Sequence, residues 1–192
     1  MILGSLVSSL LAPEAARYIG ARNVVVLALV IAGGGMLLLG VMGNLTSYWQ
    51  LITPMFMVGV GLGSLVIASA IIMGSTPVAK AGNAVALEEC TYELGDVLGI
   101  AIIGSVAAAS YRANLPVGGL GKPLADAARE SLVGALSVAR DLSLPDLAAQ
   151  AVTAFNTGII QASLAGGVII LLAAVVVFMM VPKDFDIVAA EH

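Results

Sequence analysis

Charged and metal-binding side chains are scarce in this sequence. Only 10% of the 192 residues are charged, whereas soluble domains carry about 25%. The eight basic residues are scattered and form no patch, which argues against nucleic-acid binding. The one histidine is the last residue, His192, so we expect no metal site. The one cysteine, Cys90, excludes an internal disulfide, and we interpret it as a packing residue.

Nucleophile and phosphate-loop motifs are also absent, so the sequence does not indicate an enzyme and no cofactor is expected. What it contains is apolar: 60% of the residues are hydrophobic, and the mean hydropathy is +1.07. Such a composition predicts an all-α polytopic transmembrane helix bundle, with the lipid bilayer as its first partner. The expected location is the inner (plasma) membrane, crossed several times.

Long charge-free runs place the predicted spans. A spanning helix needs roughly 20 apolar residues, and no charge occurs from Asn23 to Ala79, a run long enough for two helices. The segment Gly43-Asn44-Leu45-Thr46-Ser47 supplies a turn between them. We predict four full spans and one partial span, at residues 1–12 (partial), 24–43, 48–73, 83–110 and 154–181.

The connections between these spans indicate their orientation. Basic residues in short loops mark the cytoplasmic side, and they occur at alternate ends of the spans, at Arg17, Arg22, Lys80 and Lys183. This predicts that three segments are cytoplasmic: the short polar connection at residues 13–22, the connection at residues 74–82, and the C-terminus.

The longest connection, residues 111–153, is predicted to lie outside. Residues 124–142 can form an amphipathic helix there. The sequence Ser143-Leu144-Pro145-Asp146 is a helix-start signal, because proline suits the first turn and an acid suits the positive end of the helix dipole.

Pairs of small residues four positions apart predict close helix crossings in a membrane bundle. Examples of this pattern are Gly59/Gly63, Gly95/Gly99 and Gly158/Ala162/Gly166.

Four carboxylates interrupt the otherwise apolar span 83–110, at Glu88, Glu89, Glu93 and Asp96. No Lys or Arg lies inside any predicted span to pair with them. An ionisable group within the bilayer is costly and by default marks an ion or substrate pathway. At 100° per residue, the acids and Tyr92 fall within about 140° of one another, so they share one helix face.

This face is suited to bind protons, organic cations, or both in turn. Burial and mutual repulsion favour protonated carboxylates, whereas a nearby cation favours ionised ones. One site with two exclusive occupants is the basis of antiport. Glu93 is expected near the membrane midplane, where transporters place their substrate sites, and Tyr92 can stack on a cation. The alternative is that the acids are structural, above all Glu88, and that Tyr92 packs between helices.

Residues 74–95 read GSTPVAKAGNAVALEECTYELG. This run closely resembles the penultimate helix of the fourteen-span drug:proton antiporters of the major facilitator superfamily, which export quaternary ammonium antiseptics and dyes. In that family a Pro-x-x-Lys-Ala-Gly-Asn loop leads into a Glu-Glu-x-x-Tyr-acid-Leu-Gly helix. The resemblance implies the C-terminal part of a major-facilitator fold and proton-coupled multidrug efflux, with antiseptic resistance as its consequence.

The resemblance also implies residue roles. The family's acids for cation recognition and proton coupling fall on Glu89 and Glu93, with Glu88 beside them, and Asp96 stands where the family often has Asn. The chain would hold the last five of fourteen helices, so the missing N-terminal half of the transporter is an expected partner. The chain would then be a fragment of a larger transporter or a truncated product.

Two other functions remain open. One is a major-facilitator carrier of another solute, although a neutral or anionic substrate would usually require Arg or Lys in the spans, and none is present. The other is a membrane protein without transport activity, either an assembly partner or an inert remnant.

Overall fold

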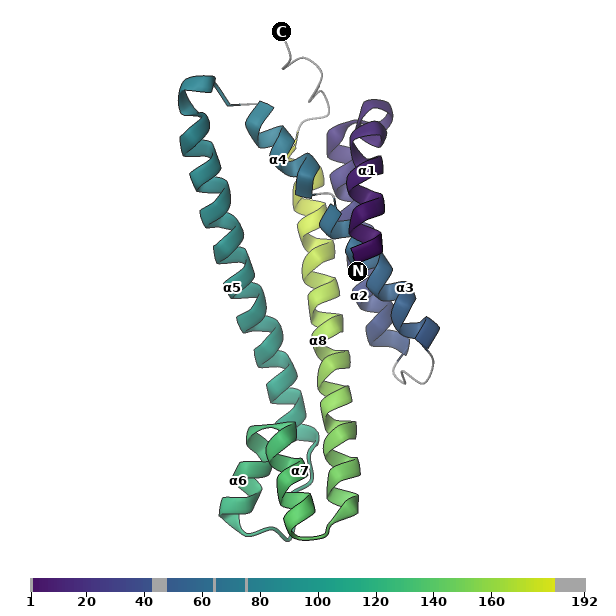
Figure 1. The fold of residues 1–192 in the computed structure, drawn as a ribbon, viewed down its shortest axis with the longest axis vertical. Coiled ribbons are helices and arrows are strands. Elements are labelled where there is room, and N and C mark those ends of the chain that lie inside the picture. Colours follow the sequence, from purple (N-terminus) through teal and green to yellow (C-terminus); the bar gives the residue numbers. More distant parts are fainter. Residues whose placement is uncertain (1, 43–47, 64, 75, 182–192) are drawn as a thin grey trace.

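The computed structural model describes residues 2–42, 48–63, 65–74 and 76–181, and within these ranges every regular element is a helix (Figure 1). The all-α prediction is therefore confirmed. In chain order the elements are α1 (Ile2–Ile19), α2 (Ala21–Met42), α3 (Tyr48–Gly63), α4 (Leu65–Gly74), the 3₁₀ turn η1 (Val78–Lys80), α5 (Ala81–Asn114), α6 (Lys122–Glu130), α7 (Leu132–Asp141) and α8 (Pro145–Met180).

Four helical stretches among the described residues are long and apolar enough to cross a membrane, as predicted. They are Ala21–Met42, Leu51–Gly74, Val78–Asn114 and Pro145–Met180. The second combines α3 and α4. The turn predicted at residues 43–47 lies outside the described residues.

The predicted break after residue 12 is wrong. Helix α1 continues through Pro13 to Ile19, and the polar connection shrinks to Gly20, whose φ of +84° reverses the chain. A proline inside a helix removes one hydrogen bond, but the helix is held by packing, because Ala12 is buried in a cluster with Val24 and Ile67. Arg22, expected in the connection, belongs to the first turn of α2.

Close helix crossings form where small residues meet. Helices α2 and α8 cross where Gly33 faces Gly167, so that a Cβ added to Gly167 would lie 3.0 Å from the Gly33 carbonyl oxygen. Helices α1 and α3 meet in the same way at Gly4 and Gly59. The predicted pattern Gly59/Gly63 thus marks a real crossing, and so does Gly158/Ala162/Gly166, whose members are all buried on α8.

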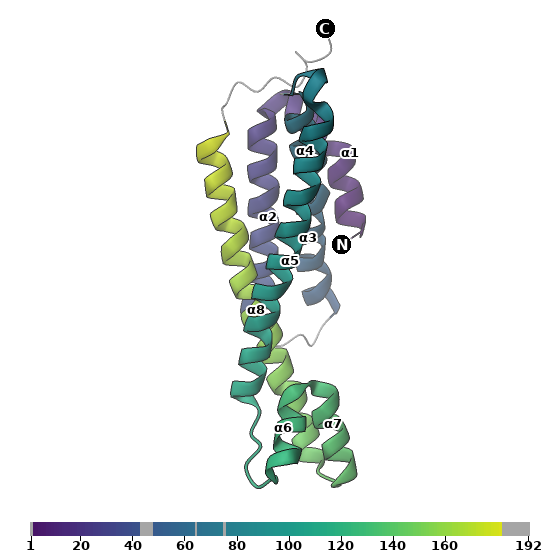
Figure 2. The same cartoon turned by 90° about the vertical axis from the view of Figure 1, so that its left-hand side faces the viewer.

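Helices α5 and α8 are longer than a membrane requires. With 34 and 36 residues they reach about 51 and 54 Å, against a hydrocarbon thickness of roughly 30 Å. Figures 1 and 2 show both helices running on to the end of the molecule where α6 and α7 pack. Residues 145–153, predicted as part of the external connection, therefore belong to α8, which begins at Pro145 as its start signal predicted.

The single amphipathic helix predicted at residues 124–142 is in fact two helices. Ser131 is extended (φ −159°, ψ 159°), and its side-chain oxygen accepts a hydrogen bond from the Gly134 N–H. Serine is a preferred residue at this capping position, so α7 starts anew there. The break turns α6 and α7 into a helical hairpin against α5 and α8, with Ala128, Ala135 and Ala151 fully buried.

Tyr111 attaches this helical hairpin to α5 by hydrogen bonding. Its buried hydroxyl lies 2.9 Å from the Ala128 carbonyl oxygen and 3.2 Å from that of Ser131, so it donates at the junction of α6 and α7. We expect Tyr111→Phe to weaken the attachment by about 1 kcal/mol, the usual cost of losing one buried hydrogen bond. Hydrogen exchange should then accelerate in α6 and α7 but not in α2. Unchanged exchange in the hairpin would refute this role.

The two ends of the bundle are distinct. The α1–α2 junction, η1 and the end of α8 lie at one end, and α6 and α7 lie at the other (Figures 1 and 2). The described parts of residues 13–22 and 74–82, both predicted to be cytoplasmic, therefore share one end, opposite residues 112–146. The C-terminus, also predicted to be cytoplasmic, lies outside the described residues. Which end faces the cytoplasm stays a prediction.

Candidate functional site

The four acids lie on one uninterrupted helix. Helix α5 begins at Ala81, directly after η1, and remains α-helical to Asn114. The spacing of the acids therefore holds in the structure, and Glu88, Glu89, Glu93 and Asp96 share one face with Tyr92. At 1.5 Å per residue, Glu93 lies about 18 Å along the helix axis from Ala81.

This half of α5 stands apart from the other described helices (Figure 1). Glu89, Glu93 and Asp96 are exposed, Tyr92 is 57% exposed, and Glu88 is half-buried. The opposite face is equally open, with Leu87 70% exposed. Both faces of the acid-bearing half are thus left uncovered by the described helices.

The space around individual glycines shows where α5 packs against another helix and where it does not. A Cβ added to Gly158 of α8 would lie 2.8 Å from the carbonyl oxygen of Ala107, so α5 packs tightly on α8 in its second half. A Cβ added to Gly95 or Gly99 meets nothing within 4 Å. The predicted close crossing at Gly95/Gly99 is therefore not made by any described helix.

The carboxylates have no ionic partner among the described residues. The ion pair found there, between Arg17 and Glu14 at 3.7 Å, lies on the exposed surface of α1. No three His, Cys, Asp or Glu side chains in the described ranges could jointly hold a metal ion. Cys90, predicted to pack, is exposed on this half of α5. Chemically, the face offers several unpaired anionic groups to protons or to a cation.

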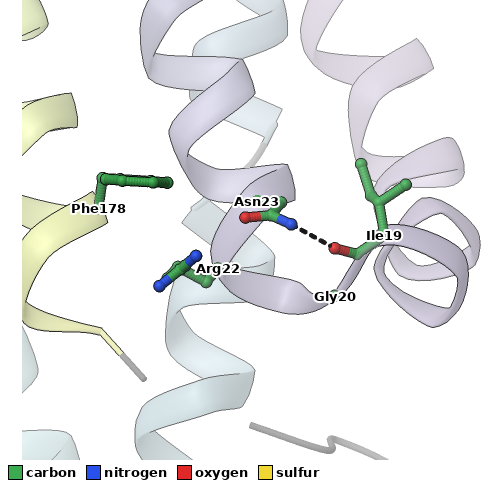
Figure 3. Close-up of a pocket in the computed structure, with 5 residues that line it drawn as sticks. All are labelled: Ile19, Gly20, Arg22, Asn23 and Phe178. Carbon is green, nitrogen blue, oxygen red and sulfur yellow. Dashed lines mark hydrogen bonds between the residues drawn. The ribbon is translucent and has the colours of Figure 1, made fainter. Parts of the chain in front are cut away.

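The structure reveals one further site that the sequence interpretation missed. Arg22, in the first turn of α2, is only 9% exposed, and its guanidinium carbon lies 4.6 Å from the centre of the Phe178 ring (Figure 3). The candidate span Ala21–Met42 starts earlier than the predicted span 24–43, and its first turn therefore contains this buried cation. The signal was Gly20, since a helix that ends at a glycine lets the next one begin immediately after it.

Comparison with known proteins finds similarity to a bacterial efflux pump. The chain is 33% identical to the multidrug efflux pump LfrA of Mycolicibacterium smegmatis (strain ATCC 700084 / mc(2)155) over 178 residues. The alignment covers 90% of this chain but 35% of the relative, so the chain spans about a third of that protein's length. No protein-family model matches the chain.

This match and the long apolar helices make the chain a membrane protein that is distantly homologous to a multidrug efflux pump. The expectation of a transport-related membrane protein rather than an enzyme agrees with this homology.

Proposed function

We propose that this chain is the C-terminal part of a proton-coupled major-facilitator transporter that exports lipophilic cations such as quaternary ammonium compounds. The observation that carries the proposal is the set of unpaired acids on α5, in a chain related to a multidrug efflux pump. The resemblance of residues 74–95 to the fourteen-span antiporters supports the same assignment.

Charge supports a cationic substrate. An uncompensated carboxylate within the bilayer is costly, and the described residues place no Lys or Arg within ion-pair distance of Glu89, Glu93 or Asp96. Protons neutralise these groups in one state and a lipophilic cation in the other. Glu89 and Glu93 take the roles of cation recognition and proton coupling, Glu88 and Asp96 extend the same anionic face, and Tyr92 stacks on the cation.

The two occupants exclude each other, which couples their movements. Cation binding favours ionised carboxylates, so protons leave as the cation arrives. Protonation on the other side of the membrane removes the attraction and releases the cation. A site near the middle of the bilayer, reached alternately from each side, is the arrangement that secondary transporters use.

The uncovered half of α5 supports the presence of further helices. The carboxylate-bearing face of a spanning helix must avoid lipid, and no described helix covers it. The small residues Gly95 and Gly99 beside it leave room for a closely packed neighbour. Because the homologous pump is much longer than this chain, we propose that helices of the N-terminal half of the transporter lie against this face.

The test replaces the matching segment of the homologous pump with this chain and expresses the fusion in bacteria that lack their main efflux pumps. Tetraphenylphosphonium serves as the lipophilic cation. We expect cells with the fusion to accumulate less of it than cells with the empty vector, and we expect a protonophore to abolish the difference. A neutral lipophilic dye is the control substrate, and its accumulation should not change.

The unmodified pump serves as the reference for insertion and abundance. A fusion that reaches the membrane at the same level and leaves tetraphenylphosphonium accumulation unchanged would contradict the proposal. Efflux that persists after the proton gradient collapses would contradict the proton coupling alone.

A further inference from the structure

A pocket of about 340 Å³ lies between the α1–α2 junction and the end of α8 (Figure 3). It is lined by Ile19, Gly20, Arg22, Asn23 and Phe178. Four of these come from the junction, and Phe178 comes from the last turn of α8. The proposed transport function uses none of them.

The guanidinium of Arg22 is the unusual group in this pocket. It is buried, its Nη1 donates to the Val181 carbonyl oxygen at 3.3 Å, and it lies against the Phe178 ring. Its Nε is buried without a hydrogen-bond partner, and no carboxylate of the described residues forms an ion pair with it. A buried charge with an unused donor is costly, and the described residues supply no anion to the pocket.

The backbone around Arg22 adds to this anion-attracting field. Helix α2 begins at Ala21, directly after the reversal at Gly20. The first N–H groups of a helix have no partner within that helix, and the positive end of the helix dipole lies with them. The Asn23 side chain donates to the Ile19 carbonyl oxygen at 2.7 Å and so holds the turn in place (Figure 3).

The apolar part of the pocket identifies the kind of anion. Phe178 offers a hydrocarbon surface beside the guanidinium, and Ile19, which is half-exposed, lines the same pocket. A free anion makes no use of such a surface, whereas a phospholipid places its glycerol and acyl carbons next to its phosphate. The pocket also lies at the ends of two helices that can span a membrane, and basic pockets between such helices are suited to lipid head groups.

We propose that this pocket binds the phosphate group of an anionic membrane phospholipid. The phosphate accepts from the guanidinium of Arg22 and from the first N–H groups of α2, and Phe178 contacts the carbons next to it. The bound lipid thereby links the α1–α2 junction to the end of α8.

The test uses native mass spectrometry of the purified 192-residue chain in detergent, titrated with phosphatidylglycerol or phosphatidylcholine. We expect Arg22→Gln to weaken phosphatidylglycerol binding by about tenfold, the effect of losing one charge-assisted hydrogen bond. Arg22→Lys should retain part of the affinity. The matched control is Arg17→Gln, which removes an exposed charge from the last turn of α1 and should leave binding unchanged.

A second measurement uses the unsubstituted chain, so it does not depend on whether a variant folds. Hydrogen exchange of the unaltered chain should slow at residues 20–23 when phosphatidylglycerol is added, and less so with phosphatidylcholine. Protection by both lipids alike, or equal phosphatidylglycerol affinity in the unaltered chain and Arg22→Gln, would overturn the proposal.

Two competing occupants are separated in the same experiment. Displacement of phosphatidylglycerol by an equal concentration of inorganic phosphate would assign the pocket to a free anion and overturn the lipid assignment. A gain of lipid binding in the double variant Asp184→Asn/Asp186→Asn would assign it to the chain's own carboxylates, with the same consequence. We expect neither result.

Discussion

Glu93→Gln in the fused transporter should reduce proton-driven efflux of tetraphenylphosphonium by roughly tenfold to a hundredfold. The estimate follows from the loss of one charge-assisted contact to a desolvated cation, worth about 1.5–3 kcal/mol. Glutamine keeps the size and polarity of the side chain but can neither release a proton nor neutralise a cation. The measurement is the initial rate of efflux from preloaded cells after an imposed pH gradient.

The size of the effect should differ among the acids. Glu89→Gln should act like Glu93→Gln, because the resemblance gives both the same role. Glu88→Gln should act less, since Glu88 is half-buried at the edge of the shared face. Glu130→Gln is the matched control, because it makes the same chemical change on the exposed surface of α6. Normal efflux in Glu93→Gln, with the fusion at normal abundance, would exclude Glu93 from the coupling site.

The helical architecture could be predicted because membrane helices leave a strong signal. A span must satisfy its backbone internally and must be predominantly apolar, so long apolar runs identified the four candidate spans. Pro145 and Asp146 marked the start of α8 because proline and an acid suit the first helical turn. Such local rules do not depend on which elements pack together.

Breaks within helices were harder to predict because packing and capping compete there. A polar connection was predicted from Pro13 onward, but buried contacts around Ala12 keep α1 continuous to Ile19. Ser131 gave no break in the apolar periodicity, yet its side chain caps a new helix and divides the predicted one in two. In both cases a few tertiary contacts or one hydrogen bond decide the outcome.

The candidate site was predictable as a helix face but not as an enclosed site. Residue spacing alone places Glu89, Glu93 and Asp96 on one side of α5. What surrounds that side depends on neighbouring helices, and none of the described helices covers it. Arg22 was missed for the complementary reason, because its burial depends on Phe178, which is far from it in sequence.

The second large effect concerns the crossing of α2 and α8. A side chain at Gly167 would collide with Leu37, whose Cγ lies 2.8 Å from the added Cβ, and with the Gly33 carbonyl oxygen. Gly167→Leu should therefore force the helices apart and destabilise the purified chain by about 2–3 kcal/mol, the cost of overpacking a tight contact. The measurement is unfolding in mixed micelles, followed by circular dichroism.

Gly95→Leu is the matched control, and it also tests the proposed partner helices. In the purified chain nothing lies within 4 Å of a Cβ at Gly95, so this substitution should leave stability unchanged or raise it by up to about 1 kcal/mol through helix propensity. In the fused transporter the same leucine would stand where helices of the N-terminal half are proposed to pack. We therefore expect Gly95→Leu to impair efflux or assembly of the fusion while sparing the isolated chain. If Gly95→Leu is harmless in both settings, the face beside the acids contacts lipid rather than protein. The neighbouring carboxylates would then be unshielded from lipid, and this result would contradict the proposed transport site as well.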